Sequence, residues 1–576
     1  MAAERRLPWD AFADWLHSIL VVTFDLELGQ ALEVVYPGHA KLTEAEKQSI
    51  CYLAFPDSNS GCMGDSVFHF RTRRLSTPPP SSNALRLYQR SCPSPLQVDA
   101  GYYFGFVYFR QVSDKSIPRG YFQKSVVVLS QLPLVRLFRE VVGAMAPEYF
   151  ASGEAGLEAA CHDVDQWPSP LPGRPLALPL LGTLLHLRIP SRFDPPHHLH
   201  TPQVSRGTQT PSPTVLASVH EAFLYESFAS VLPHLQLLWE LVLLGEPLVV
   251  MAPSPTQCST VVQALVTLIW PLRYCQDYRP FFTIHDSEFK EYTSRTQPPP
   301  NVILGVTNPF FCKTLQHWPH VLRLLEDSGD SPRNAKVKKG GDLRTLDSKP
   351  GVYTLYKPFL AKDKSFLKRL IKGAESMRPS EAQSAIIRRH FSELTQSFMI
   401  PLERYVASLM PLQKQISPFK STPQPRRFDM REFLASVEDA GPQLTSGLKG
   451  DWAGLYRAFL RSAHARGWLA TRLDEVGEKL EQLHLEVVCS ASLEDLAEKP
   501  ELELVDLLLK FRAKRAYVLS QDLQPDFLHK LDLQIQAVLD ALSPDLRASL
   551  LLSSQPQPPH TSLRPHQPPS PSHSVS

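Results

Sequence analysis

The chain has 576 residues, and its 60 Lys and Arg side chains nearly balance 58 Asp and Glu, which leaves a net charge of +2. This balance argues against a nucleic-acid-binding protein, because such a protein needs a basic surface to replace the counterions of phosphate. Hydrophobic residues make up 43% of the chain, enough to fill cores, and the length corresponds to about three or four domains. The 53 prolines outnumber the 26 glycines and indicate stiff linkers.

No targeting, membrane-spanning or metal-binding pattern stands out in the sequence. Asp14 and Asp25 interrupt the apolar run that a signal peptide would need near the N-terminus. The longest apolar stretch, near Leu235–Met251, is broken by Glu240 and Glu246. The eight cysteines form no CxxC pair and are interpreted as reduced thiols. We therefore expect a cytoplasmic protein without a cofactor or metal.

Residues 1–165 are predicted to form an α+β lobe. Two apolar runs, Ser18–Asp25 and Ala31–Tyr36, flank a turn, and a helix over Leu42–Leu53 can begin with a capping box of Thr43 and Glu46. Further strands are predicted at Ser66–Thr72, Leu85–Gln89, Tyr102–Val112 and Tyr121–Leu129. Several antiparallel strands followed by helices are typical of a sheet covered by helices.

Residues 166–215 are predicted to be a proline-rich linker between two lobes. Prolines crowd both ends of the segment, and one strand is predicted between them, at Thr183–Ile189.

Residues 216–325 alternate between helix and strand, as an α/β lobe does. Helix Ala229–Leu244 precedes strand Pro247–Met251, and Ser254 can cap the following helix, Pro255–Leu268. Two later strands are predicted at Phe281–Ile284 and Val302–Val306. The loop after Met251 lacks the Gly-rich, Lys-containing sequence of a phosphate-binding loop, so we predict no nucleotide site there.

The remaining residues are predicted to be largely helical. Residues 326–355 form a charged loop and connection, which we interpret as a surface loop rather than a lipid contact because acids offset its lysines. Residues 356–552 contain apolar stripes at helical spacing, and Pro401 is expected to break or kink its helix. Residues 553–576 are predicted to be a disordered tail.

The sequence contains none of the familiar catalytic motifs. HExxH, GxSxG, GxGxxG and the Walker lysine loop are all missing. We therefore predict no catalytic residue for covalent chemistry and expect a protein that acts through its surface.

Three stretches, in their order along the chain, resemble the tripartite DENN-domain family. They are Asp25–Gln30 with Val34–Pro37, then Leu248–Ser254 with Pro280–Ile284 and Val302–Asn308, and finally the helical block after Lys349-Pro350-Gly351. The segment Asp347–Tyr353 is most similar to DENN-domain subfamily six. The resemblance implies α/β and α+β architecture: a longin-like upstream lobe, a central α/β lobe and a downstream helical region.

The resemblance also implies a function. Members of this family promote GDP release and GTP loading on Rab GTPases, so we expect a Rab partner bound preferentially in its GDP-bound or nucleotide-free state. We expect recycling endosomes as the location, with peripheral membrane association only through partners and no nucleic acid. Carried over to this chain, the GTPase-binding residues are His285, Asp286, Ser287, Phe289, Asn308, Phe310 and Phe311. One of the two adjacent phenylalanines is expected in the core.

Three other interpretations stay open. The chain could be a scaffold that binds a small GTPase without exchanging its nucleotide. It could activate GTP hydrolysis, with Arg71, Arg73 or Arg74 as the arginine supplied to the GTPase. Asp286 could instead cap a helix over Ser287–Tyr292.

Overall fold

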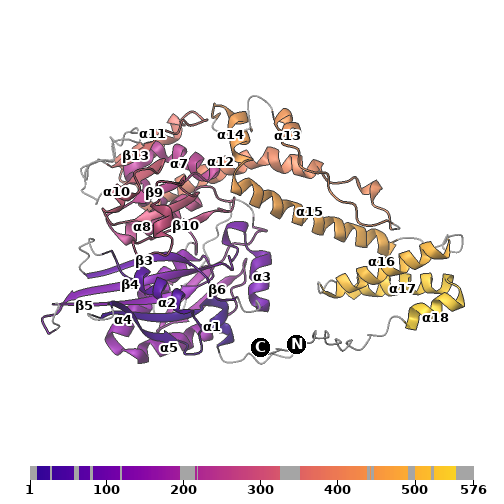
Figure 1. The fold of residues 1–576 in the computed structure, drawn as a ribbon, viewed down its shortest axis with the longest axis horizontal. Helices are drawn as coiled ribbons and strands as arrows, with labels where there is room; N and C mark the ends of the chain where they lie inside the picture. The colour runs from indigo at the N-terminus through magenta and orange to yellow at the C-terminus, as the bar shows by residue number, and fades with distance from the viewer. Residues whose placement is uncertain are drawn as a thin grey trace, which may run out of the picture. The chain divides into compact units, whose positions relative to one another are not determined.

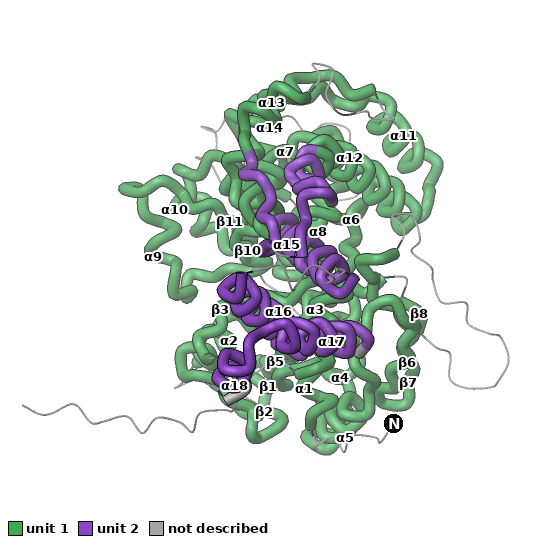
Figure 2. The backbone as a smooth tube through the Cα atoms, turned by 90° about the vertical axis from the view of Figure 1, so that its right-hand side faces the viewer, with its two compact units in different colours: residues 1–404, 429–470 green, residues 405–428, 471–576 purple. Residues whose placement is uncertain are grey.

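The computed structural model (Figure 1) describes residues 9–25, 29–57, 64–77, 82–116, 120–194, 214–216, 218–324, 350–418, 420–437, 442, 447–490, 500–520 and 525–552. The chain divides into two compact units, unit 1 with residues 1–404 and 429–470 and unit 2 with residues 405–428 and 471–576 (Figure 2). Residues 326–349 of the predicted charged loop and connection at 326–355 lie outside the described residues, as does the predicted tail at 553–576. The three sheets of unit 1 are not separated into units of their own, so the predicted domain boundaries stay predictions.

An antiparallel sheet forms the upstream lobe, with strand order β2-β1-β5-β4-β3. Its strands are β1 Ser18–Asp25, β2 Gly29–Tyr36, β3 Gly64–Arg73, β4 Tyr102–Ser113 and β5 Tyr121–Ser130. In β4 every residue from Tyr103 to Phe109 is buried, which confirms a central strand covered on both faces.

The helices of this lobe are α1 Asp10–Trp15, α2 Glu44–Leu53, α3 Asn83–Ser91, the 3-10 turn η1 Ser94–Leu96, α4 Val135–Ser152 and α5 Glu154–Asp165. Helices α2 and α4 pack on the strands of the sheet, and α5 packs on α4 and α1. Both halves of the predicted capping box are present, since the Thr43 hydroxyl accepts from the Glu46 N–H and the Glu46 carboxylate accepts from the Thr43 N–H. The strand predicted at Leu85–Gln89 is wrong, because these residues lie in α3. The Ser82 hydroxyl accepts from the Leu85 N–H and starts the helix there.

The proline-rich segment contains more than the one predicted strand. Strands β6 Pro175–Leu180 and β7 Thr183–Arg188 form a hairpin, and β8 Thr214–Val215 pairs parallel to β7. Strand β6 lies at the edge of this sheet, where a proline without an N–H is tolerated, so its prolines did not prevent pairing.

The central lobe is an α/β layer around the sheet β10-β11-β9-β12-β13, in which only the β12–β13 pair is antiparallel. Its strands are β9 Leu248–Met251, β10 Asp277–Arg279, β11 Val302–Val306, β12 His320–Arg323 and β13 Gly351–Thr354. Its helices are α6 Leu224–Phe228, the 3-10 helix η2 Ala229–His234, α7 Leu235–Leu244, α8 Pro255–Thr267, α9 Phe289–Tyr292 and α10 Phe311–Thr314.

The strand predicted at Phe281–Ile284 is misplaced, because β10 ends at Arg279. After Pro280 the two phenylalanines pack into different cores: Phe281 joins the upstream core and Phe282 the central one. The Phe282 N–H still donates to the Gly305 carbonyl at 2.8 Å, which keeps the segment beside β11. The apolar residues of this segment are therefore buried as expected, but they are buried because they pack against two lobes and not because they form a strand.

One stretch of the described residues, Leu224–Leu244, is long and apolar enough by composition to cross a membrane, and 78% of its apolar 18-residue window is buried. Such burial is typical of a core helix. Its fully buried Glu240 carboxylate accepts hydrogen bonds from the Phe359 and Leu360 N–H groups and from the Tyr356 hydroxyl, so the charge has partners.

The remaining helices are α11 Lys364–Glu375, α12 Ser380–Ser408, η3 Gln413–Gln415, α13 Met430–Ser436, α14 Trp452–Phe459, α15 Ala463–Ser490, α16 Glu501–Ser520, α17 Pro525–Ala541 and α18 Pro544–Leu552. The predicted stripe from Ile387 to Phe398 is buried in α12, as expected. A break at Pro401 is not observed, since α12 continues to Ser408 and buries Leu402, Tyr405 and Val406 after the proline. Packing beyond the proline offsets the hydrogen bond that it removes.

Candidate functional site

Alternating charges join the upstream lobe to the central lobe. The guanidinium of Arg71, on β3, lies 3.0 Å from the Asp99 carboxylate and 2.5 Å from that of Asp277, on β10. It also lies 3.3 Å from the centroid of the Tyr102 ring, and its side chain is only 4% exposed. Asp277 in turn accepts from Arg279 at 2.9 Å. Because each buried charge has an opposite partner, the network holds the two lobes together rather than leaving Arg71 available to another molecule.

The same network continues to the surface of the junction. One oxygen of the Glu288 carboxylate, Oε1, accepts from Arg279 at 2.9 Å and from Arg73, at the end of β3, at 3.1 Å. Its other oxygen accepts from the Ser287 hydroxyl at 2.8 Å. The Arg73 side chain is 52% exposed, so the network ends at an accessible arginine.

A cleft of about 390 Å³ opens where this network reaches the surface. We call it the interlobe cleft. One wall comes from α2 and the end of β3, and the other from the segment after β10; the lining residues include Glu46, Ser49, Tyr52, Arg73, Arg279, Thr283, His285, Asp286, Ser287 and Glu288. The second wall lies just beyond the carboxyl end of β10, the side of a parallel sheet on which ligands commonly bind.

The pKa values of two carboxyl groups in the cleft, Asp286 and Glu288, are shifted in opposite directions. Burial raises the pKa of Asp286 to about 7; Arg279 opposes the shift and the neighbouring Glu288 adds to it. Burial also acts to raise the pKa of Glu288, but Arg279 and the Ser287 hydroxyl hold it below its ordinary value. Glu288 is therefore the ionised member, and Asp286 holds its proton to an unusually high pH.

Three of the predicted GTPase-binding residues lie in this cleft. His285 and Ser287 are exposed and Asp286 is half-buried. The His285 ring stacks on Tyr52 of the opposite wall, with centroids 4.6 Å apart.

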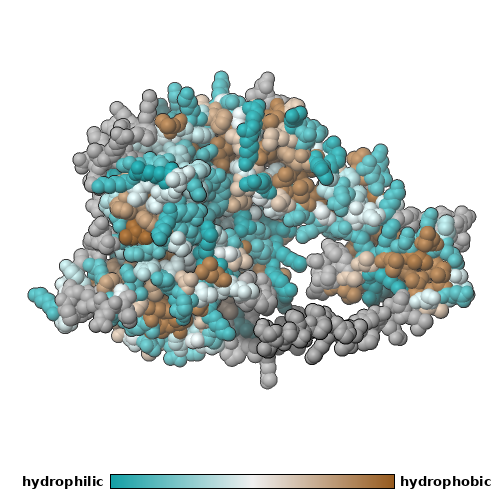
Figure 3. Space-filling model, in the orientation of Figure 1, coloured by the Kyte–Doolittle hydropathy of each residue, from teal (hydrophilic) through white to brown (hydrophobic). Residues whose placement is uncertain are grey.

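The other four predicted residues lie beside the cleft, at the carboxyl end of the same sheet. The half-buried Phe289 ring stacks with Phe310 at 6.3 Å, and Phe310 is 50% exposed. Phe311 is fully buried and belongs to the central core, so it is the member of the pair that packs inside. Asn308 is nearly buried, and its side-chain oxygen accepts from the Phe310 N–H at 3.0 Å, which fixes the turn that presents Phe310. In Figure 3 a hydrophobic patch is visible on unit 1 near α10.

The sequence did not identify Tyr52, Arg279 and Glu288 as site residues, and it offered Arg73 only as an arginine for GTP hydrolysis. The pairs Arg71/Arg73 and Asp277/Arg279 each have the two-residue spacing that places side chains on one strand face, but no sequence signal shows that the two strands meet. The helix-cap interpretation of Asp286 is wrong. The residue that precedes α9 is Glu288, and Asp286 contributes its backbone carbonyl to the turn by accepting from the Phe289 N–H at 3.0 Å.

The arginines proposed for GTP hydrolysis are differently placed. Arg71 is enclosed by the network described above, and the Arg74 guanidinium lies over the Tyr103 ring at 5.1 Å. Arg73 alone of the three is largely exposed, and it is paired with Glu288.

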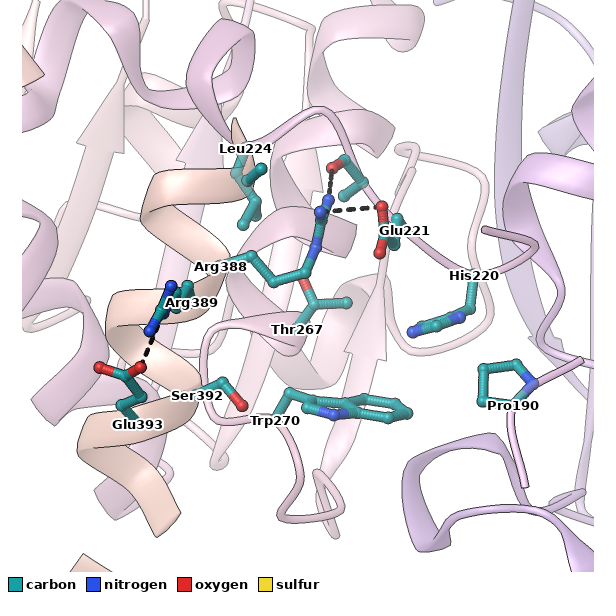
Figure 4. A pocket seen from close by; sticks show the side chains of 12 residues that line it. Pro190, His220, Glu221, Leu224, Thr267, Trp270, Arg388, Arg389, Ser392 and Glu393 are labelled. Atoms are coloured by element: carbon teal, nitrogen blue, oxygen red, sulfur yellow. Dashed lines mark hydrogen bonds and ion pairs between the residues drawn. The ribbon is translucent and has the colours of Figure 1, made fainter. Parts of the chain in front are cut away.

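A second cavity of about 280 Å³ lies elsewhere in unit 1, beside α12 (Figure 4). Its charges neutralise one another, because Arg388 pairs with Glu221 at 2.8 Å and Arg389 pairs with Glu393 at the same distance. Its histidine, His220, stacks on Trp270 with centroids 4.7 Å apart, and burial lowers the pKa of His220 to about 3. This histidine therefore stays neutral at physiological pH, and the cavity offers no charged group that lacks a partner.

The sequence was compared with protein families and with individual known proteins. Residues 493–553 match the family described as the DENND6 C-terminal domain, and residues 16–156 match the family described as transport protein Avl9. Protein DENND6A of Gallus gallus is 56% identical over 551 residues, which cover 95% of this chain and 94% of that protein. Protein DENND6B of Homo sapiens is 54% identical over 549 residues, 94% of each chain. Protein DENND6 homolog of Dictyostelium discoideum is 33% identical over 579 residues, 88% of this chain and 78% of that protein. The chain therefore belongs to the DENND6 family of DENN-domain proteins.

Proposed function

We propose that the protein is a guanine-nucleotide exchange factor for a Rab GTPase, with the interlobe cleft and the adjacent Phe289–Phe310 pair as the docking surface. Membership of the DENN family supports a small-GTPase partner. The observation that carries the proposal is the position of the Phe289–Phe310 pair, in which Phe310 is exposed, beside a charged cleft that two lobes build together.

The cleft has the chemistry of a protein interface. Exposed Phe310 supplies an apolar anchor, and His285, Ser287 and Arg73 supply polar groups around it. Aromatic anchors surrounded by polar contacts are typical of the centre of a binding surface. A GTPase that spans both walls would contact residues whose relative positions the ion network already fixes, and such preorganisation lowers the entropy lost on binding.

Exchange in this proposal needs no covalent chemistry. The protein would bind the nucleotide-free GTPase more tightly than the nucleotide-bound forms, and by reciprocity incoming GTP would release the exchange factor. A thousandfold faster GDP release corresponds to roughly 4 kcal/mol of preferential binding to the open state. An interface of ordinary size can supply a difference of that order.

We propose that this exchange takes place in endosomal recycling, because the resemblance to the DENN-domain family implies that pathway. We propose a GDP-bound or nucleotide-free Rab as the form that is engaged, because the cycle begins with release of GDP.

A fluorescent-GDP release screen across a panel of Rab GTPases tests the proposal with the full chain. We expect accelerated release from one Rab or a small group of them. Asp286→Arg should lower that acceleration at least tenfold, because it places a cation beside Arg279 and disturbs the wall of the cleft. Glu478→Arg, at an exposed position of α15, is the matched charge reversal and should leave release unchanged.

The outcomes separate the alternatives. Binding to a Rab without faster GDP release would identify a scaffold and contradict exchange. Faster GTP hydrolysis without faster GDP release would identify an activating role. The enclosure of Arg71 disfavours that role for this residue, and Arg73→Ala tests it for the one exposed arginine.

A further inference from the structure

Helix α11 and the residues on both sides of it form a basic surface, which we call the α11 surface and define as residues 357–378. It contains seven basic residues and only two acidic ones, a net charge of +5 in a chain whose total charge is +2. All seven basic residues are exposed: Lys357, Lys362, Lys364, Lys368, Arg369, Lys372 and Arg378. Positive charge is therefore concentrated here.

Packing fixes the orientation of α11. Asp363 caps the helix by accepting from the Phe366 N–H at 2.9 Å, so one of the two acids is used within the fold. Phe366 and Leu370 are buried, and the Phe366 ring stacks on His390 of α12 with centroids 3.7 Å apart. Because this apolar face is held inside, the charged side chains of the opposite face project into solvent as a set.

An exposed methionine follows the helix in a conformation that methionine rarely adopts. Met377 has a φ of 51°, in the left-handed region, and it is 88% exposed. The helix ends in a Schellman motif, since the Arg378 N–H donates to the Gly373 carbonyl at 3.0 Å and the Met377 N–H to the Ala374 carbonyl at 3.2 Å. Glycine is the usual residue at this left-handed position.

The stability of the fold does not explain why a methionine occupies this exposed, left-handed position. A left-handed conformation is strained for a residue with a side chain, and an exposed thioether gains no compensating burial. One further apolar side chain of the α11 surface, Ile371, is 37% exposed, and Leu355, two residues before this surface begins, is 73% exposed. Apolar side chains among lysines and arginines form the pattern of a surface that meets a lipid interface.

We propose that the α11 surface binds directly to membranes that contain anionic phospholipid. The basic side chains contact the lipid phosphates and carboxylates, and Met377 with Ile371 enters the boundary between headgroups and acyl chains. The charge complementarity identifies the partner, because a surface of +5 is attracted to an anionic bilayer and not to a neutral one. Membrane association through partners alone, as the family resemblance implies, would not need this surface.

The position of α11 is compatible with the proposed docking of a GTPase. Figure 2 shows α11 and α9 at opposite sides of unit 1. Membrane contact through α11 therefore leaves the segment around α9 accessible, and the two proposals can be tested independently.

Vesicle sedimentation with the full chain tests the inference. We expect binding to vesicles of phosphatidylcholine mixed with phosphatidylserine, little binding to phosphatidylcholine alone, and weaker binding at high salt. The double variant Lys368→Glu with Arg369→Glu should lower binding at least tenfold, since each basic residue near an anionic surface contributes severalfold. The double variant Arg457→Glu with Arg461→Glu, at exposed positions in α14 and just after its end, has the same charge change and should bind as the parent does.

Met377→Gly separates an effect on lipid binding from an effect on folding. Glycine relieves the left-handed strain, so the melting temperature should rise, while vesicle binding should fall about threefold or more because the apolar side chain is lost. GDP release in solution should be unchanged in all of these variants. Equal binding to neutral and anionic vesicles, or unchanged binding of the Lys368/Arg369 variant, would overturn the proposal. So would binding to an acidic peptide in the absence of vesicle binding, which would make the surface a protein-binding site.

Discussion

The Tyr52 ring stacks almost parallel on the His285 ring, with centroids 4.6 Å apart and an interplanar angle of 16°. Tyr52 belongs to α2 of the upstream lobe, whereas His285 follows β10 of the central lobe. Below this contact, Phe68 of β3 meets Phe281 with centroids 5.3 Å apart. The junction thus has an apolar layer, an ion network and a stacked pair at its surface, and each layer joins the same two lobes.

We predict that this stacked pair is energetically coupled. Tyr52→Ala and His285→Ala should each lower the free energy of unfolding by about 0.5–1.5 kcal/mol, since the contact is aromatic and close to the surface. Together they should cost less than the sum of the two, because the second change removes a partner that is already gone. A double-mutant cycle in urea measures the coupling, and strict additivity would show that the rings do not support each other.

The arginines of β3 should differ sharply in their effect on stability. Arg71→Ala removes the partner of Asp99 and Asp277 inside the junction, and we expect a loss of about 3–5 kcal/mol. Arg73→Ala removes a 52% exposed side chain, and we expect a loss of less than about 1 kcal/mol. Urea unfolding of both variants provides the comparison, with Arg73→Ala as the control for removing an arginine from the same strand. Similar losses in both would contradict the assignment of Arg71 to the lobe junction.

Local patterns in the sequence predict the architecture of the lobes but not the contacts that join the upstream lobe to the central lobe. The order of sheet, α/β layer and helices follows from periodicity and caps, and the Thr43–Glu46 box was predicted in full because a cap depends on neighbours three residues apart. The pairing of Arg71 with Asp277 spans 206 positions, and no local pattern encodes it. For the same reason the apolar run at Phe281–Ile284 resembles a strand in the sequence, although its two phenylalanines pack into two cores that only the fold brings together.

The adjacent phenylalanines of the candidate site offer a matched pair of variants. Phe311 is fully buried, so Phe311→Ala should destabilise the protein by about 3–5 kcal/mol. Phe310 is 50% exposed, so Phe310→Ala should cost about 1 kcal/mol or less in stability while reducing GDP release at least tenfold through the loss of an apolar anchor. Melting temperature and GDP release are to be measured on the same preparations. A stable Phe310→Ala variant with full exchange activity would remove Phe310 from the docking surface.

We predict that Asp286 makes stability fall as the pH rises. Its carboxyl group keeps its proton up to about pH 7 in the folded chain, because burial raises its pKa, with Glu288 adding to the shift and Arg279 opposing it. In the unfolded chain an aspartate loses its proton near pH 4. Between about pH 4 and 7 the folded state therefore binds more protons than the unfolded state, and the free energy of unfolding decreases across this range and levels off above it. The other titratable side chains that line the cleft are the same in the parent and in a variant changed only at residue 286; they are Glu46, Tyr52, Arg73, Arg279, His285 and Glu288.

Asp286→Asn keeps the shape of the side chain and removes its titration. The variant should be more stable than the parent, by an amount on the order of 1 kcal/mol at pH 8 that shrinks toward pH 4. Glu288→Gln is the control of opposite sign: Arg279 holds the pKa of Glu288 low, so the ionised carboxylate stabilises the fold above its pKa, and its loss should destabilise the protein at neutral pH. Urea unfolding of the parent and both variants from pH 5 to 8 gives the three profiles. If the gain in Asp286→Asn were the same at every pH, or if the variant were less stable at pH 8, the carboxyl group would be ionised in the folded protein and the assignment of the proton to Asp286 would be wrong.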